Sequence, residues 1–302
     1  MCLANVRNMV LGGLILLLGV GCGSSRPVAR WDEPYRYARQ RAVSPVPAPF
    51  SRPAPTPVSR PAPPPARPKS ESAAVLDMGL KMRVITDREI QKISARDPDL
   101  SPSVIRHILS RINAKAAYYI EEDIRDGRPL IVPNDLRAYK KWSPLDPYIP
   151  ALAEVPKFIL LVKDEFFLGW YEEGRLVGDS HVCIGKKDGW TRAGVYTVKE
   201  KDADHVSRSY TNAYGEPAPM PWALRIYEHV WIHAGDITEG NCSRGCINLP
   251  VFVAPKLFAW ADKGTAVMIV DSLDDVEPEL ARNRSNCQLF ARSCRTRQAM
   301  LD

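Results

Sequence analysis

The chain has 302 residues, of which 45% are hydrophobic, 25% are charged and 27 are proline. Its net charge of +6 is uneven, because residues 1–70 carry +8 and the remaining residues sum to −2. A nucleic-acid-binding domain needs positive charge on its folded surface, so this composition argues against DNA or RNA as a partner. No stretch after residue 21 reaches the ~20 apolar residues that span a bilayer, which excludes a protein with several membrane-spanning helices.

Residues 1–22 are typical of an export signal. Arg7 precedes Met9–Gly21, an unbroken run of apolar residues and glycine. As a helix this run covers ~20 Å, less than the ~30 Å hydrocarbon core, so we expect cleavage. The run ends in Leu18-Gly19-Val20-Gly21-Cys22, which resembles the lipobox of bacterial lipoproteins except that Gly19 stands where leucine is usual. The resemblance implies lipidation at Cys22, with an ordinary cleaved signal or an uncleaved anchor as alternatives.

Residues 23–74 form a proline-rich segment. From Val43 to Pro68, 11 of 26 residues are proline, interleaved with alanine, arginine and serine. Proline removes backbone donors, and the segment lacks the apolar mass to offset chain entropy, so we predict a disordered linker. Fully extended as polyproline II, at ~3.1 Å per residue, this stretch spans ~80 Å. Signal and linker together predict an exported protein of the cell envelope, tethered to a membrane and facing the periplasm.

Residues 75–150 carry helix signals. Thr86-x-x-Glu89 is typical of a capping box and predicts a short helix near Asp87–Ala95. Ser101-Pro102 predicts the start of a longer helix that ends at Gly127. These helices hold no cluster of catalytic residue types. Their role is left open between positioning glycan or a partner and packing against the next domain.

From Pro156 onward the apolar pattern becomes that of short strands, and we predict a mainly β, sandwich-like domain over residues 156–272. One helix near Val251–Asp262 interrupts the pattern, and the charged tail, residues 273–302, is expected to be loosely attached. The expected strands are Phe158–Val162, Phe166–Tyr171, Arg175–Ile184, Val195–Val198, Ala223–Tyr227, Val230–Ile232 and Ala266–Val270.

Two residues suited to nucleophilic catalysis lie 13 positions apart, His233 and Cys246. A thiol with a pKa near ~8.5 needs a nearby imidazole or cation to become thiolate at neutral pH. His233 follows the strand Val230–Ile232, in which Val230 and Ile232 face the core, so that Trp231 and His233 lie on the open face. Gly245, just before the cysteine, allows close backbone approach, with amides free to point at an anion.

This pattern resembles the L,D-transpeptidase catalytic domain, the YkuD-like family of cell-wall enzymes. The signature is a histidine, a spacer, then Ser-x-Gly-Cys followed by an aliphatic residue and arginine or asparagine, here Ser243 to Asn248. Arg244 stands where the family often has histidine, and Arg192-Ala193-Gly194 where it often has Pro-x-Gly. The resemblance covers residues 156–271 and includes Val177–Lys186, Thr191–Val198, Met220–Arg225, Leu257-Phe258 and Gly264–Val267.

The resemblance implies acyl transfer without a cofactor or metal. Cys246 attacks the carbonyl of the third residue of a peptidoglycan tetrapeptide stem and expels D-Ala, with His233 as the base. A second stem (3→3 cross-linking), an amine of a wall-attached protein, or water accepts the acyl group, and a carbapenem acylates the cysteine. Because no hydroxyl follows His233, a backbone carbonyl such as that of Ala234 or Gly235, or a distant side chain, is expected to orient it. The backbone N–H groups of Arg244, Gly245 and Cys246 are expected to form the oxyanion hole. The side chains of Ser243 and Asn248 are expected to support the site. Substrate walls are expected from Tyr210, Met220 and Trp222, for which core packing is the alternative.

Three alternatives remain open. His229, His233, Cys242 and Cys246 could form a zinc set, but in a strand the two histidines lie ~13 Å apart, too far for one ion. A disulfide is the second, because five cysteines follow the leader: Cys183, Cys242, Cys246, Cys287 and Cys294. A Cys183–Cys242 pair would leave Cys246 free, whereas a bridge at Cys246 would end the enzyme hypothesis. The third is a non-catalytic peptidoglycan-binding module on the same fold.

Overall fold

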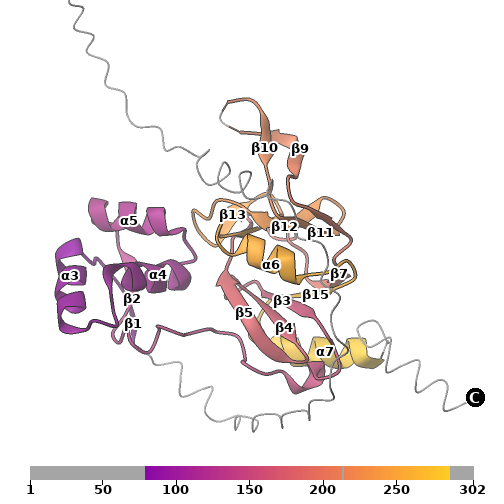
Figure 1. Cartoon of the computed structure of the whole chain (residues 1–302), viewed down its shortest axis with the longest axis horizontal. Coiled ribbons are helices and arrows are strands. Elements are labelled where there is room, and N and C mark those ends of the chain that lie inside the picture. The colour runs from indigo at the N-terminus through magenta and orange to yellow at the C-terminus, as the bar shows by residue number, and fades with distance from the viewer. Residues whose placement is uncertain (1–78, 213, 286–302) are drawn as a thin grey trace, which may run out of the picture.

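The computed structural model describes residues 79–212 and 214–285 (Figure 1). The expected signal (1–22) with Cys22, the linker (23–74) and the end of the tail, with Cys287 and Cys294, lie outside the described residues. Within the described ranges, no helix combines the length and apolar character needed to cross a membrane.

The first part of the described chain, Leu80 to Pro133, is mostly helical, and we call it the helical unit. It comprises β1 (Leu80–Arg83), α3 (Asp87–Arg96), α4 (Pro102–Ile112), α5 (Ala117–Asp126) and β2 (Leu130–Pro133), with β1 antiparallel to β2. The hydroxyls of Thr86 and Ser101 accept hydrogen bonds from the backbone N–H groups of Glu89 and Val104, as their capping patterns predict. The apolar sides of the helices enclose a separate core that includes Ile90, Ile105, Leu109, Ile120 and Leu130.

The single helix expected from Ser101 to Gly127 is wrong, because the chain breaks between α4 and α5. Asn113 ends α4, and Ala114 follows with a left-handed φ of 44°. The amide of Asn113 donates to the carbonyls of Leu109 and Ile131, and its Oδ1 accepts from the N–H of Ile131. The two bonds with Ile131 tie the end of α4 to β2, so the helix ends where an asparagine bonds to a strand.

The β domain begins with a five-stranded sheet in the order β5-β4-β3-β15-β7. Its strands are β3 (Phe158–Val162), β4 (Phe167–Glu172), β5 (Arg175–His181), β7 (Gly194–Thr197) and β15 (Ala266–Val270). The central strand β3 is buried along its whole length, because Ile159 and Leu161 face one apolar core while Phe158, Leu160 and Val162 face another. Burial on both faces explains why β3 and β15 are unbroken apolar runs.

A second, four-stranded sheet in the order β14-β12-β11-β8 packs against the core that contains Ile159 and Leu161. It comprises β8 (Glu200–Asp202), β11 (Ala223–Tyr227), β12 (Val230–Ala234) and β14 (Ile247–Leu249), with β12 and β14 parallel. Helix α6 (Ala254–Trp260) places Ala254 and Leu257 in the same core. The mainly β, sandwich-like architecture predicted from the sequence is therefore confirmed.

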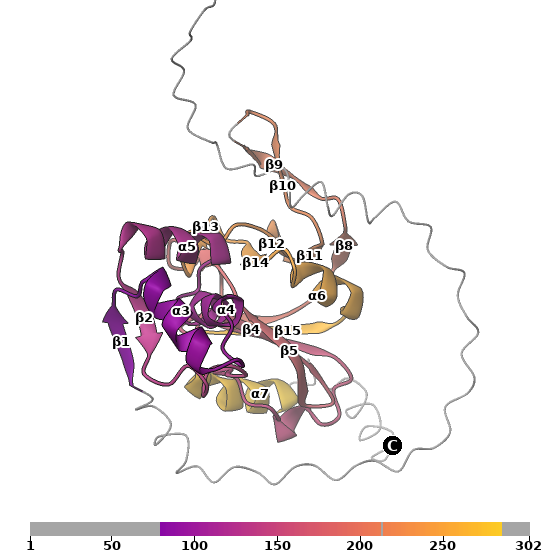
Figure 2. The same ribbon diagram turned by 60° about the vertical axis from the view of Figure 1, so that its left-hand side comes forward.

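Three smaller features complete the domain. Strands β6 (Ile184–Gly185) and β13 (Asn241–Ser243) pair in parallel, and β9 (Val206–Thr211) with β10 (Pro217–Pro219) forms a hairpin that projects from the body in both views (Figure 2). Two short 3-10 helices are Pro150–Leu152 and Leu273–Asp275. The expectation of a loosely attached tail is wrong for its first part, because α7 (Val276–Ser285) packs Val276 and Leu280 onto the outer face of the first sheet.

A disulfide joins Cys183 to Cys242, 59 positions apart, and so links the segment between β5 and β6 to β13. Among the cysteines of the described residues, Cys246 is free. Of the pairings considered from the sequence, the structure contains the one in which Cys183 bonds to Cys242 and Cys246 stays free.

Candidate active site

His233 lies near the end of β12, directly opposite Asn248 of the parallel strand β14. Its side chain is buried, and its Nδ1 is 2.8 Å from the carbonyl oxygen of Ala234. A carbonyl only accepts hydrogen bonds, so Nδ1 carries the proton and Nε2 keeps its lone pair. Ala234 is one of the two backbone partners expected from the sequence. Burial lowers the pKa of His233 to about 4, although the bond to Ala234 partly opposes this shift.

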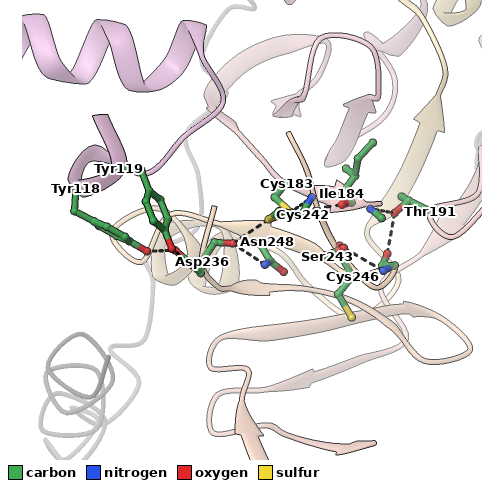
Figure 3. The surroundings of a disulfide bond; sticks show 12 residues. Tyr118, Tyr119, Cys183, Ile184, Thr191, Asp236, Cys242, Ser243, Cys246 and Asn248 are labelled. Carbon is green, nitrogen blue, oxygen red and sulfur yellow. Dashed lines mark hydrogen bonds between the residues drawn. A yellow bond between two sulfur atoms is a disulfide. The ribbon is translucent and has the colours of Figure 1, made fainter. Parts of the chain in front are cut away.

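Cys246 follows a tight turn between β13 and β14 (Figure 3). The hydroxyl of Ser243 donates to the carbonyl of Cys246 at 2.6 Å and accepts from the N–H of Gly245 at 3.0 Å. Gly245 has a φ of 125°, and a Cβ there would lie 3.0 Å from the carbonyl oxygen of Trp190. The turn therefore needs both the serine hydroxyl and a glycine, as the Ser-x-Gly-Cys pattern requires.

Thr191 supports the same turn from the neighbouring loop. Its Oγ1 accepts from the N–H of Gly185 at 3.0 Å and donates to the carbonyl of Gly245 at 2.9 Å. The side chain is buried, and both of its hydrogen bonds are to backbone groups. Thr191 thus connects Gly185, in β6, to Gly245, the residue before Cys246.

The thiol of Cys246 points away from the disulfide (Figure 3) and packs against Met220, Ala223 and Trp231. Its Sγ is 3.7 Å from the carbonyl oxygen of His229, to which it donates. Burial raises the pKa of the Cys246 thiol above its ordinary value of 9.0, and a hydrogen bond from the backbone of Trp231 only partly offsets this. The thiol is therefore neutral near pH 7 in this conformation.

The strand register brings Cys246 and His233 to one face of the second sheet. Ile247 lies opposite Ile232, and Asn248 opposite His233, so Cys246 enters beside Trp231. Alternation along a strand puts Trp231 and His233 on the same face, and the thiol packs on Trp231. Since burial favours the neutral form of both groups, this arrangement differs from the thiolate expected from the sequence, and the proton stays on sulfur in the resting state.

The other site residues expected from the sequence are only partly brought together. Met220 packs beside the thiol, and the exposed guanidinium of Arg244 lies over the ring of Tyr210, 4.4 Å from its centroid. Trp222 packs instead on Phe258 in the core between the sheets, so the core alternative holds for this residue.

The expected oxyanion hole also changes. The N–H of Gly245 donates to Ser243 and is not available to a substrate. The N–H groups of Arg244 and Cys246 remain as the possible donors from this turn. Asn248 contributes by another route, since its Nδ2 donates to the backbone carbonyl of Asp236 at 2.8 Å.

A zinc site built on four ligands loses one of them to the disulfide. Cys242 is bonded to Cys183 and cannot act as a thiolate ligand. Across the residues that the structure describes, no group of three or more histidine, cysteine or acidic side chains could hold a metal ion.

Three residues of this region were not singled out from the sequence as site residues. Thr191 is one, although it falls in a segment that resembles the family. His205 stacks on Trp231 with ring centroids 3.9 Å apart, and its Nδ1 is 3.0 Å from Asp202. Asp236 lies two residues after the end of β12. Its local sequence does not indicate a site residue, because its side-chain partners lie in the helical unit.

Comparison with known proteins finds a family model that matches the β domain. Residues 156–269 match the family model of the L,D-transpeptidase catalytic domain, YkuD. No match is found among curated proteins.

Solved structures with similar chains include three L,D-transpeptidases. The one from Mycobacterium smegmatis is 19% identical, with 38% of this chain and 59% of that chain covered and a TM-score of 0.35. The one from Stackebrandtia nassauensis is 18% identical, with 56% and 76% covered and a TM-score of 0.39. A mutant form of the Enterococcus faecium enzyme is 27% identical, with 38% and 50% covered and a TM-score of 0.34. The chain thus spans less than two thirds of the first and third of these proteins. Residues 156–269 are thus similar to the L,D-transpeptidase catalytic domain, and the match is confined to this part of the chain.

Proposed function

We propose that this protein is a cysteine acyltransferase that cross-links peptidoglycan stem peptides, with Cys246 as the nucleophile and His233 as the general base. The observation that carries the proposal is the free thiol of Cys246 beside Trp231, on the sheet face that bears an imidazole with an unprotonated Nε2. A thiol and an imidazole base at one site are the minimal pair for acyl transfer through a thioester.

The first half-reaction forms the thioester. Sγ attacks the carbonyl carbon of the third stem residue while its proton passes to Nε2 of His233. The oxygen of the tetrahedral intermediate is held by the N–H groups of Arg244 and Cys246, each worth about 3 kcal/mol in sites of this kind. The imidazolium then returns the proton to the departing amine, and D-Ala leaves.

The second half-reaction resolves the thioester. The side-chain amine of a second stem attacks the thioester carbonyl, His233 removes a proton from that amine, and the thiol is restored with a 3→3 cross-link formed. An amine of a wall-attached protein or a water molecule can replace the stem as acceptor. The proton transferred to His233 comes from sulfur in the first step and from the acceptor in the second, so one neutral base serves both.

We further propose that the enzyme works at the cell envelope, exported and tethered through a lipid at Cys22 by the linker of residues 23–74. The run of small residues before Cys22 supports a lipidation site. Mass spectrometry of the amino-terminal peptide from membranes tests this proposal, since a diacylglyceryl mass on Cys22 is expected and an unmodified Cys22 contradicts it.

The test of function incubates the purified full-length chain with disaccharide-tetrapeptide and analyses the products by mass spectrometry. We expect cross-linked dimers and free D-Ala with the wild type and neither with Cys246→Ala or His233→Ala. Ser243→Thr, which keeps the hydroxyl, is a control for disturbance of the turn. Binding of the tetrapeptide without release of D-Ala would overturn the proposal and indicate a non-catalytic peptidoglycan-binding module.

A further inference from the structure

The loop that follows His233 is held by the helical unit. The carboxylate of Asp236 accepts hydrogen bonds from the phenols of Tyr118 and Tyr119, both on α5, the latter at 2.8 Å (Figure 3). One residue later, the carbonyl of Ile237 accepts from the backbone N–H of Ala116 at 2.7 Å. Three hydrogen bonds from the start of one helix therefore fix two successive residues of this loop.

The same loop contacts the strand pair that carries the site. The backbone carbonyl of Asp236 accepts the amide of Asn248, which lies opposite His233 in the β12–β14 register. The Asn248 side chain also covers Gly235 so closely that a Cβ on that glycine would lie 2.7 Å from Cγ of the asparagine. Asp236 thus connects the phenols of Tyr118 and Tyr119 to Asn248, the residue opposite His233 in the strand register.

The imidazole depends on this segment for its orientation. Its Nδ1 bonds to the carbonyl of Ala234, two residues before Asp236. A rotation of the peptide units between Ala234 and Asp236 turns that carbonyl, and the bond that holds the proton on Nδ1 is then lost. Because Nε2 must keep its lone pair to act as base, the loop determines whether His233 is in its reactive tautomer.

We propose that Asp236 is a positioning residue for His233, held in place by Tyr118 and Tyr119, so that docking of the helical unit is part of assembling the active site. The inference rests on the proposed function of His233 and gives the helical unit a role in the rate of the reaction rather than only in the binding of the cell wall. Burial raises the pKa of Asp236 to about 6, which shows how enclosed the carboxyl is once α5 covers it.

The experiment compares Tyr118→Phe/Tyr119→Phe, which keeps both rings but removes both phenol donors, with the wild-type full chain. We expect kcat for dimer formation to fall by about 10- to 100-fold, as for misplaced catalytic groups, while KM for tetrapeptide changes by less than about twofold. Nitrogen-15 spectra of the imidazole should show the Nδ1–H tautomer in the wild type and a mixture of tautomers in the variant. Unchanged kcat and an unchanged tautomer would overturn the inference.

The matched control is Arg111→Met, which breaks another contact between the helical unit and the β domain. Arg111 forms an ion pair with Asp179 of β5 at 2.8 Å, donates to the carbonyl of Trp142 and lies over the ring of Phe167, and none of these partners belongs to the loop or to β12. We expect this variant to lose stability with kcat within about twofold of the wild type. An equal loss of kcat in Arg111→Met would overturn the specific role of Asp236 and leave only general docking.

Two further arms keep the test decisive. Should the double variant fail to fold, Tyr119→Phe and Asp236→Asn replace it, and the asparagine, which keeps one carbonyl acceptor, should retain more activity than Asp236→Ala. Failure of the proposed function appears differently, as absence of turnover in the wild type itself. Turnover in the wild type with equal rates in all loop variants overturns only the positioning role.

Discussion

The protonation states of Cys246 and His233 predict that removal of the imidazole lowers the rate of acyl transfer but hardly changes the rate at which the thiol is alkylated. Burial holds the pKa of the Cys246 thiol above its ordinary value, so the thiol is almost entirely protonated at pH 7. With the pKa of the imidazole at about 4, only about 0.1% is imidazolium at that pH. This protonation pattern excludes a preformed thiolate–imidazolium pair, so in the proposed mechanism the imidazole accepts the proton only when the substrate is attacked.

The assay is the rate of Cys246 alkylation by iodoacetamide between pH 5 and 9, with the site identified by peptide mass. We expect the rate to rise about tenfold per pH unit from pH 6 to 8, because the thiol is still almost entirely protonated over that range. His233→Ala should change alkylation at pH 7 by less than about threefold, yet lower acyl transfer by about 10²- to 10⁴-fold. Cys246→Ala gives the background from other cysteines.

The reasoning is refuted by a pH-independent alkylation rate between pH 5 and 8, which is the behaviour of an ion pair. It is refuted equally by a His233→Ala variant whose thiol is more than about tenfold less reactive at pH 6, since the imidazole would then stabilise the thiolate. Turnover should remain high down to about pH 5 and fall as His233 is protonated near pH 4.

Three further predictions concern the turn before Cys246 and the Cys183–Cys242 disulfide. Thr191→Val leaves the bonded backbone groups without their partner and should lower the free energy of unfolding by about 1–3 kcal/mol, measured by urea denaturation, whereas Thr191→Ser should be nearly neutral. Gly245→Ala adds a Cβ near the carbonyl of Trp190 at a φ of 125°, so we expect loss of turnover with Cys246 still present, and wild-type kcat would contradict the strain argument. Reduction of the Cys183–Cys242 bond, which closes a loop of about 60 residues, should cost about 4 kcal/mol of stability, and a melting temperature that is the same with and without reductant would show that the loop is held by other contacts.

Much of the β domain could be predicted from local patterns. The strands Ala223–Tyr227 and Ala266–Val270 have the bounds expected from the sequence, because their apolar residues match the burial of a sheet. Strands such as Pro217–Pro219 and Asn241–Ser243 have three residues and little apolar character, and they exist because a distant segment pairs with them. Local pattern carries no information about such pairing.

The candidate site divides in the same way. His233 and Cys246 could be identified because their chemistry is rare and their spacing is informative. The contributions of Thr191 and Asp236 depend on partners 54 and 117 or 118 positions away, so only the folded chain reveals them. The protonation states also depend on burial, which the sequence-based expectation of a thiolate did not include.

The bridge between Cys183 and Cys242 has a consequence for how the protein matures. Cys242 is only four positions from the reactive sulfur, and during folding it is the neighbour best placed to capture it. Once Cys242 is bonded to Cys183, no other cysteine of residues 79–212 and 214–285 has a free thiol that could form a disulfide with Cys246. The bond between Cys183 and Cys242 therefore leaves the thiol of Cys246, the proposed nucleophile, free in a domain that also contains a disulfide.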